Sequence, residues 1–151
     1  MAQEFITTKE KALEALKARD YYILSAENPH NRQLPPMDNW LRLHALMMIL
    51  REEGYEPVGV IGKYNHIEHS LLVPDLPREE ALNLAAMFDQ ESVAGKEGLL
   101  LTDGRVQEAA GEPYEAPDAK DYYSRLIMDS GEELKFQIPL VDWISTPQDH
   151  V

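Results

Sequence analysis

The order of strand-like and helix-like segments between Tyr21 and Thr102 is the feature that most limits what this chain can fold into. Apolar runs rich in strand formers alternate there with segments whose apolar residues have helical spacing. The expected strands are 21–26, 58–64, 67–73 and 99–102, and the expected helices are 39–53 and 78–88. Four antiparallel strands with two helices on one face would use this β-α-β-β-α-β order, which is typical of a ferredoxin-like core. We therefore expect an α+β fold with a single ferredoxin-like core.

Two further segments are expected to flank that core. A Thr-Thr-Lys-Glu motif at 7–10 fits a capping box and predicts a short N-terminal helix. Two strand-like runs, 122–128 and 134–140, flank an Asp-Ser-Gly-Glu turn and predict a second hairpin. Residues 107–151 hold 10 acidic and 3 basic side chains, a net charge of −7. We therefore divide the chain into a core domain with its N-terminal helix, 1–106, and an acidic C-terminal extension packed on the core, 107–151.

Composition excludes several classes of function. A net charge of −13 argues against direct binding of nucleic acid, because phosphates must be neutralised by Lys and Arg. The chain has no cysteine, which excludes disulfides, thiolate catalysis and cysteine-ligated zinc. The longest apolar run, Ala45–Leu50, is too short to span a bilayer, and the N-terminus lacks the pattern of a signal peptide. We therefore expect a cytoplasmic protein without membrane contact, whose acidity serves solubility or occupies a basic groove on a partner.

Polar side chains gather where three of the predicted strands begin or end. The first expected strand ends just before Asn28, the third begins at Glu68, and Gln90 precedes the fourth; a ferredoxin-like sheet would bring these ends together. The first predicted helix adds an arginine whose planar guanidinium and nearby free amides suit an anion. We therefore predict a site for a small polar, anionic or nucleotide-like ligand at this end of the sheet. Its predicted residues are Asn28, Asn39, Arg42, Glu68, Ser70 and Gln90.

Catalysis is the less favoured interpretation of these residues. Glu27 and Glu68 could form the acid–base or metal-binding pair of a hydrolase. Alternation along the strand, however, puts His69 on the face opposite Glu68. The sequence has no Gly-rich phosphate loop, His-x-x-x-His pair or serine elbow, so we expect no catalytic residue, metal site or cofactor. Each polar residue also has a structural explanation; Arg42, for example, could pair with either glutamate.

The motifs that supply these residues follow one another in a specific order and spacing. They are Ser-Ala-Glu-Asn-Pro at 25–29, Asn-x-x-Arg-x-x-x-Leu-x-x-x-Leu-x-x-x-Gly-Tyr at 39–55, Gly62, Glu-His-Ser at 68–70 and Phe-Asp-Gln-Glu-Ser at 88–92. Together they resemble the domain-of-unknown-function 3293 family, small proteins of bacteria and their phages, over about 21–93. Many members have Trp where this chain has Glu27, which argues against a catalytic carboxylate there. The resemblance implies no established activity.

These observations lead to one expected function and two alternatives. We expect a non-enzymatic protein that binds a small polar or nucleotide-like ligand, with a phage accessory protein as one form this could take. The first alternative is an acidic module, centred on 107–151, that inhibits or modulates a host protein. The second is a hydrolase that uses a pair of glutamates.

Overall fold

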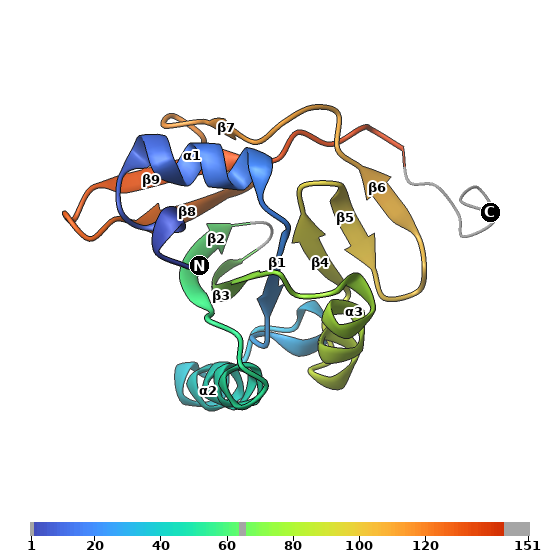
Figure 1. The fold of residues 1–151 in the computed structure, drawn as a ribbon. Helices are drawn as coiled ribbons and strands as arrows, with labels where there is room; N and C mark the ends of the chain where they lie inside the picture. Colours follow the sequence, from blue (N-terminus) through green and yellow to red (C-terminus); the bar gives the residue numbers. More distant parts are fainter. Residues whose placement is uncertain (1, 64–65, 144–151) are drawn as a thin grey trace.

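Nine strands among the described residues form one antiparallel sheet, in the order β6-β5-β4-β1-β3-β2-β8-β9-β7. The computed structural model describes residues 2–63 and 66–143. The sheet curls into a half-barrel (Figure 1). Its strands are β1 (Tyr21–Ser25), β2 (Val58–Lys63), β3 (Ile67–Pro74), β4 (Ser92–Gly95), β5 (Gly98–Leu101), β6 (Val106–Glu108), β7 (Tyr114–Glu115), β8 (Tyr123–Ile127) and β9 (Glu133–Gln137).

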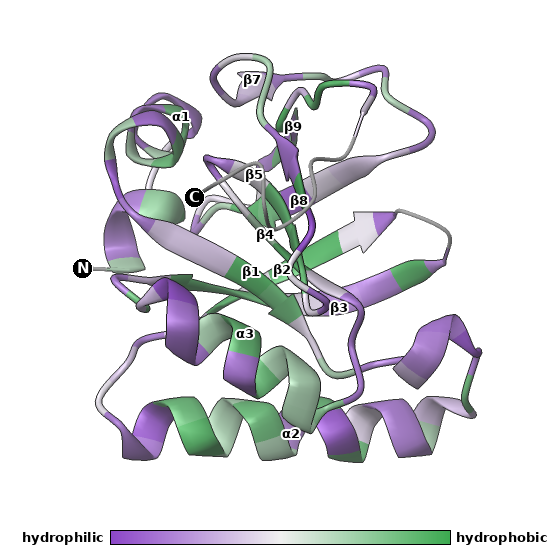
Figure 2. Cartoon of the chain, turned by 90° about the vertical axis from the view of Figure 1, so that its right-hand side faces the viewer, coloured by the Kyte–Doolittle hydropathy of each residue, from purple (hydrophilic) through white to green (hydrophobic). Residues whose placement is uncertain are grey.

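Helices cover both faces of this sheet. The helices of the described residues are η1 (Ala2–Phe5), α1 (Lys9–Ala18), η2 (Pro29–Asn31), α2 (Pro36–Glu52) and α3 (Arg78–Met87). Helix α1 lies on one side of the sheet, whereas α2 and α3 lie together on the other (Figures 1 and 2). None of the helices in the described ranges combines the length and the apolarity needed to cross a bilayer.

The helix ends follow local capping rules, with one difference from the sequence prediction at the start of α2. Thr8 caps α1 through its hydroxyl, which accepts a hydrogen bond from the Lys11 amide. Helix α2 begins at Pro36 rather than after Asp38, because proline fits the first turn, where its missing N–H costs nothing. The same helix ends as predicted at Gly54, whose φ of +92° is readily adopted only by glycine.

The strands bury apolar side chains on both of their faces. Along β1, Tyr21 and Ile23 join the cluster beneath α1, while Tyr22 and Leu24 join the cluster beneath α2 and α3. Alternation along a strand sends successive side chains to opposite faces, so four consecutive buried residues require cover on both sides. The described residues therefore form two hydrophobic clusters separated by the sheet.

The predicted ferredoxin-like core is wrong. Five further strands of the described residues extend the sheet beyond β1–β4, and the second hydrophobic cluster fills the face that such a core would leave bare. The segment 99–102, predicted as the fourth strand beside β1, falls largely in β5, which pairs with β4 and β6. The strand that pairs with β1 is β4, whose register places Ile23 opposite Ala94.

The predicted second hairpin is confirmed by β8 and β9, which pair from Ser124–Phe136 to Ile127–Glu133. Strand β8 also pairs with β2, so the described part of the acidic segment, 107–143, supplies strands to the same sheet as the N-terminal residues. Strands β2 and β3 pair as the predicted first hairpin. Its predicted turn lies partly outside the described residues, as does the segment after Trp143.

Candidate functional site

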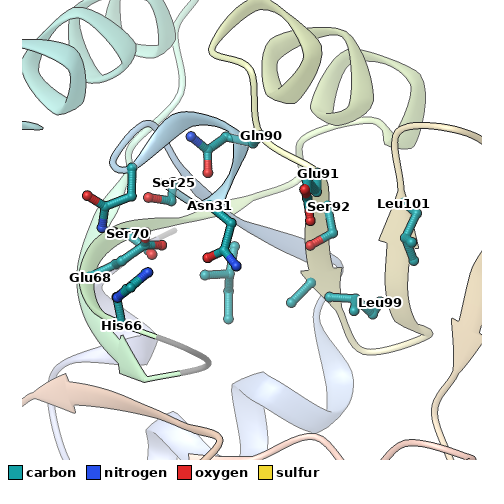
Figure 3. A pocket seen from close by; sticks show the side chains of 13 residues that line it. Ser25, Asn31, His66, Glu68, Ser70, Gln90, Glu91, Ser92, Leu99 and Leu101 are labelled. Atoms are coloured by element: carbon teal, nitrogen blue, oxygen red, sulfur yellow. Dashed lines mark hydrogen bonds between the residues drawn. The ribbon is translucent and has the colours of Figure 1, made fainter. Parts of the chain in front are cut away.

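A pocket of about 280 Å³ opens on the face of the sheet that α1 covers, between β3 on one side and β4 and β5 on the other. Because β1 runs between these strands, it forms the floor. Figure 3 shows Glu68 and Ser70 facing Ser92 and Leu99 across the pocket. The lining residues are Ile23, Ser25, Asn28, Asn31, His66, Glu68, Ser70, Gln90, Glu91, Ser92, Ala94, Leu99 and Leu101.

Strand register explains why these side chains share one face. Ser25 lies opposite Ser70 in the β1–β3 pair, and Ile23 lies opposite Ala94 in the β1–β4 pair. Residues two apart along each strand point the same way, which adds Glu68 on β3. The wall on β3 is therefore polar, whereas Leu99 and Leu101 make the wall on β5 apolar.

Ser70 is, with Asn28, one of the two buried polar residues in the described lining of this pocket. Only 7% of Ser70 is exposed, and the residue lines the pocket. A hydroxyl can both donate and accept a hydrogen bond. A ligand in the pocket could therefore use the Ser70 hydroxyl as a donor or as an acceptor.

Asn28 fixes the rim of the pocket through its backbone and its side chain. Its φ of +49° is a left-handed conformation that asparagine tolerates better than most residues. Its amide N–H donates to Asn39 Oδ1 at 2.9 Å, and its Oδ1 accepts from Leu34 N at 3.0 Å and from Asn39 Nδ2 at 2.9 Å. Its Nδ2 donates to Glu68 Oε2 at 2.8 Å. Asn28 thereby holds the Glu68 carboxylate in a fixed position.

Glu68 is the partly buried carboxylate of the polar wall. Burial raises the pKa of its side chain above the ordinary glutamate value, and the nearby Glu27 charge acts in the same direction. Hydrogen bonds from Asn28 and Ser25 and the charge of His66 lower that pKa, but they do not offset the burial. The carboxylate therefore occupies a site that lacks a strong cationic partner.

The structure brings four of the six predicted site residues to the pocket. Asn28, Glu68, Ser70 and Gln90 line it. Gln90 also serves the backbone, because its Nε2 donates to the carbonyl oxygens of Glu27 at 2.9 Å and Phe88 at 3.2 Å. The remaining two, Asn39 and Arg42, do not line the pocket, because α2 packs on the opposite face of the sheet.

Arg42 connects two chain segments behind the pocket. Its Nε donates to the Ala26 carbonyl oxygen at 2.6 Å, and one terminal nitrogen donates to the Phe88 carbonyl oxygen. The guanidinium also lies 5.8 Å from the centre of the Phe88 ring. Arg42 therefore joins the end of β1 to the end of α3, and its hydrogen bonds go to backbone rather than to the pocket.

The two glutamates weighed as a catalytic pair have separate surroundings. Glu27 is buried, and its Oε1 accepts the His69 amide N–H at 2.7 Å. Its Oε2 lies 3.6 Å from Nδ1 of His69, whose side chain is exposed. Glu27 does not line the pocket, so Glu68 is the member of this pair that a ligand could contact.

Several lining residues were missed by sequence reasoning. Ala94 belongs to β4, a four-residue strand too short to give a clear alternating pattern. Asn31 lies in the η2 turn with φ +58°, which only the left-handed tolerance of asparagine could have suggested. His66 directly precedes β3, so its spacing of two from Glu68 was a usable signal for a shared face.

Comparison with known proteins supports the resemblance and adds no activity. The model of the family described as "Protein of unknown function (DUF3293)" matches residues 24–93, which are 70 of the 151 residues. This match confirms the resemblance, and its span holds the predicted site residues and β1 through α3. No curated protein matches the chain. Within the described ranges, no group of three or more His, Asp or Glu side chains is arranged to hold a metal ion.

Proposed function

We propose that this chain is a non-enzymatic binding protein for a small organic molecule, which occupies the pocket between β3 and the β4–β5 pair. The observation that carries the proposal is the pocket itself, whose lining combines the buried Ser70, the partly buried Glu68 carboxylate and the apolar Leu99. A pocket of about 280 Å³ lies near the lower end of the range of ligand sites, roughly 300–1,000 Å³. We therefore expect an occupant about the size of a nucleobase or a nucleoside.

The arrangement of the lining favours binding over reaction. A nucleophilic serine needs a base within hydrogen-bond reach. The Ser25 hydroxyl interacts with the Glu68 carboxylate, but it is also engaged with backbone, donating to the His69 carbonyl oxygen at 3.3 Å and accepting the Glu27 amide N–H at 3.0 Å. No observation favours the hydrolase or the acidic interaction module, so both stay predictions.

A protein-observed NMR screen with an aromatic fragment library and the four common ribonucleosides tests the proposal. We expect hits that shift the amide resonances of Ser25, Glu68 and Ser70. Ser70→Ala should weaken those hits two- to tenfold, since one neutral hydrogen bond is lost, and should leave stability unchanged. Ser130→Ala, in the β8–β9 turn, is the matched control. A screen without hits, or hits that leave these three amides unshifted, would refute the proposal.

A further inference from the structure

The charged groups around the pocket are the starting point for its ligand class. Among the described lining residues, the ionisable side chains are two carboxylates, Glu68 and Glu91, and one imidazole, His66; no Lys or Arg lines the pocket. The guanidinium of Arg42 donates its hydrogen bonds to the backbone carbonyl oxygens of Ala26 and Phe88, behind the end of β1. A phosphate or carboxylate would therefore meet like charge without a strong cation to compensate it.

The Glu68 carboxylate is fixed in position and still has free sites for accepting hydrogen bonds. A carboxylate offers about four lone-pair sites. Asn28 occupies one of these sites from a side chain that is itself fixed by Asn39 and Leu34. The carboxylate is therefore held in place before any ligand arrives, which reduces the ordering cost of binding. A planar cation with two N–H donors matches such a carboxylate in bidentate geometry.

The side of the pocket opposite Glu68 determines which chemical group the remainder of the ligand should carry. Leu99 and Leu101 form an apolar wall on β5, and the strand order places Ile23 of β1 and Ala94 of β4 between that wall and β3. An apolar wall opposite a polar wall suits a flat ring that carries its polar head on one edge.

The geometry points to a planar ring with a cationic, donor-bearing head, such as an amidinium, guanidinium or protonated aminoheterocycle, whose N–H groups bind Glu68 while the ring lies against Leu99 and Leu101. This inference rests on the proposed function and narrows it to one charge class. The Ser70 hydroxyl, beside Glu68 on the same face of β3, supplies a further acceptor for that head.

Benzamidine, benzamide and benzoate test the inference, because they share one ring and one planar head but carry a positive, zero and negative charge. Their affinities are measured by NMR titration of the pocket amides. We expect benzamidine to bind about tenfold more tightly than benzamide, because a charge-assisted hydrogen bond replaces a neutral one. Benzoate should bind most weakly.

Two variants with the same change of charge locate the contact. Glu68→Gln keeps an oxygen for Asn28 Nδ2 and should remove the advantage of benzamidine over benzamide. Glu91→Gln, at an exposed position of the rim, should keep most of it. The inference would be overturned if the two variants lost the same share of the affinity advantage of benzamidine over benzamide. It would also be overturned if benzamide or benzoate bound as tightly as benzamidine. Either result would leave the proposed function standing. Failure of all three compounds to shift the pocket amides would count against the proposed function itself.

Discussion

Replacing Arg42 by alanine should destabilise the fold rather than remove a ligand contact. The substitution deletes the donors to the carbonyl oxygens of Ala26 and Phe88, the hydrogen bonds that hold the end of β1 against the end of α3. Ala26 is fully buried and Phe88 is 8% exposed, so water replaces the lost donors poorly. In the native state the Phe88 carbonyl oxygen would keep only its hydrogen bond from Gln90 Nε2 at 3.2 Å, and the Ala26 carbonyl oxygen would lose the donor that Arg42 supplies.

The size of the effect follows from these two bonds. Hydrogen bonds from a charged donor contribute about 1.5–3 kcal/mol each. Part of this loss is offset, because the alanine variant no longer has to desolvate a half-buried guanidinium on folding. We therefore expect Arg42→Ala to lower the free energy of unfolding by about 3 kcal/mol. For a chain of this length that corresponds to a fall in Tm of roughly 6–12 °C.

Urea unfolding followed by circular dichroism measures this change, with the m-value expected to stay constant. Arg51→Ala is the matched control, because Arg51 lies on the exposed side of the last turn of α2. Its loss should cost no more than about 1 kcal/mol, through the helix dipole. A loss below about 1 kcal/mol for Arg42→Ala, or losses of equal size in the two variants, would contradict the role assigned to Arg42.

Three further predictions follow from the site and the sheet. Because burial raises the pKa of Glu68, the stability it contributes is present at low pH and lost as pH rises above its folded-state pKa. Glu68→Gln should therefore be at least as stable as the parent at about pH 7.5 and lose that advantage near pH 4; a less stable variant at pH 7.5 would contradict this. Gly98→Ala should lower the free energy of unfolding by about 3 kcal/mol or more, because φ is +128° and the new Cβ would lie 2.2 Å from the Gln107 carbonyl oxygen. In the control Gly59→Ala, the new Cβ has no atom within 4 Å. Equal urea midpoints for the two variants would refute this contrast. Asn28→Ala should be about 1 kcal/mol less stable than Asn28→Gly, since both lose the side-chain hydrogen bonds but only alanine strains a φ of +49°; two matching unfolding curves would count against this.

The sequence predicted individual elements better than their assembly. Both hairpins and the three α-helices follow from alternation, helical spacing and turn residues, all of which act over a few positions. Strand β4 was missed because Ser92–Gly95 is short and three of its four residues are small, and its place was then given to the next strand. The cover on the second face was signalled by the four consecutive apolar residues from Tyr21 to Leu24, a pattern that calls for burial on both sides.

The candidate site was predictable as far as strand direction and register decide it. Asn28, Glu68 and Ser70 were found because two neighbouring strands place their polar ends at one edge. Whether Asn39 and Arg42 reach the pocket depends on whether α2 covers the same face of the sheet as the polar side chains of β1 and β3. A single sequence without a complete strand order does not fix that relation, because a shift of one residue exchanges the two faces.

The contact between Asn39 and Asn28 also gives the pocket an optical reporter. Trp40 follows Asn39 on α2, its side chain is exposed, and its ring lies 4.0 Å from that of His44. A ligand that shifts Asn28 would act, through the hydrogen bonds between Asn28 and Asn39, on the residue next to this indole. With the second tryptophan removed by Trp143→Phe, intrinsic fluorescence would follow occupation of the pocket without any attached dye.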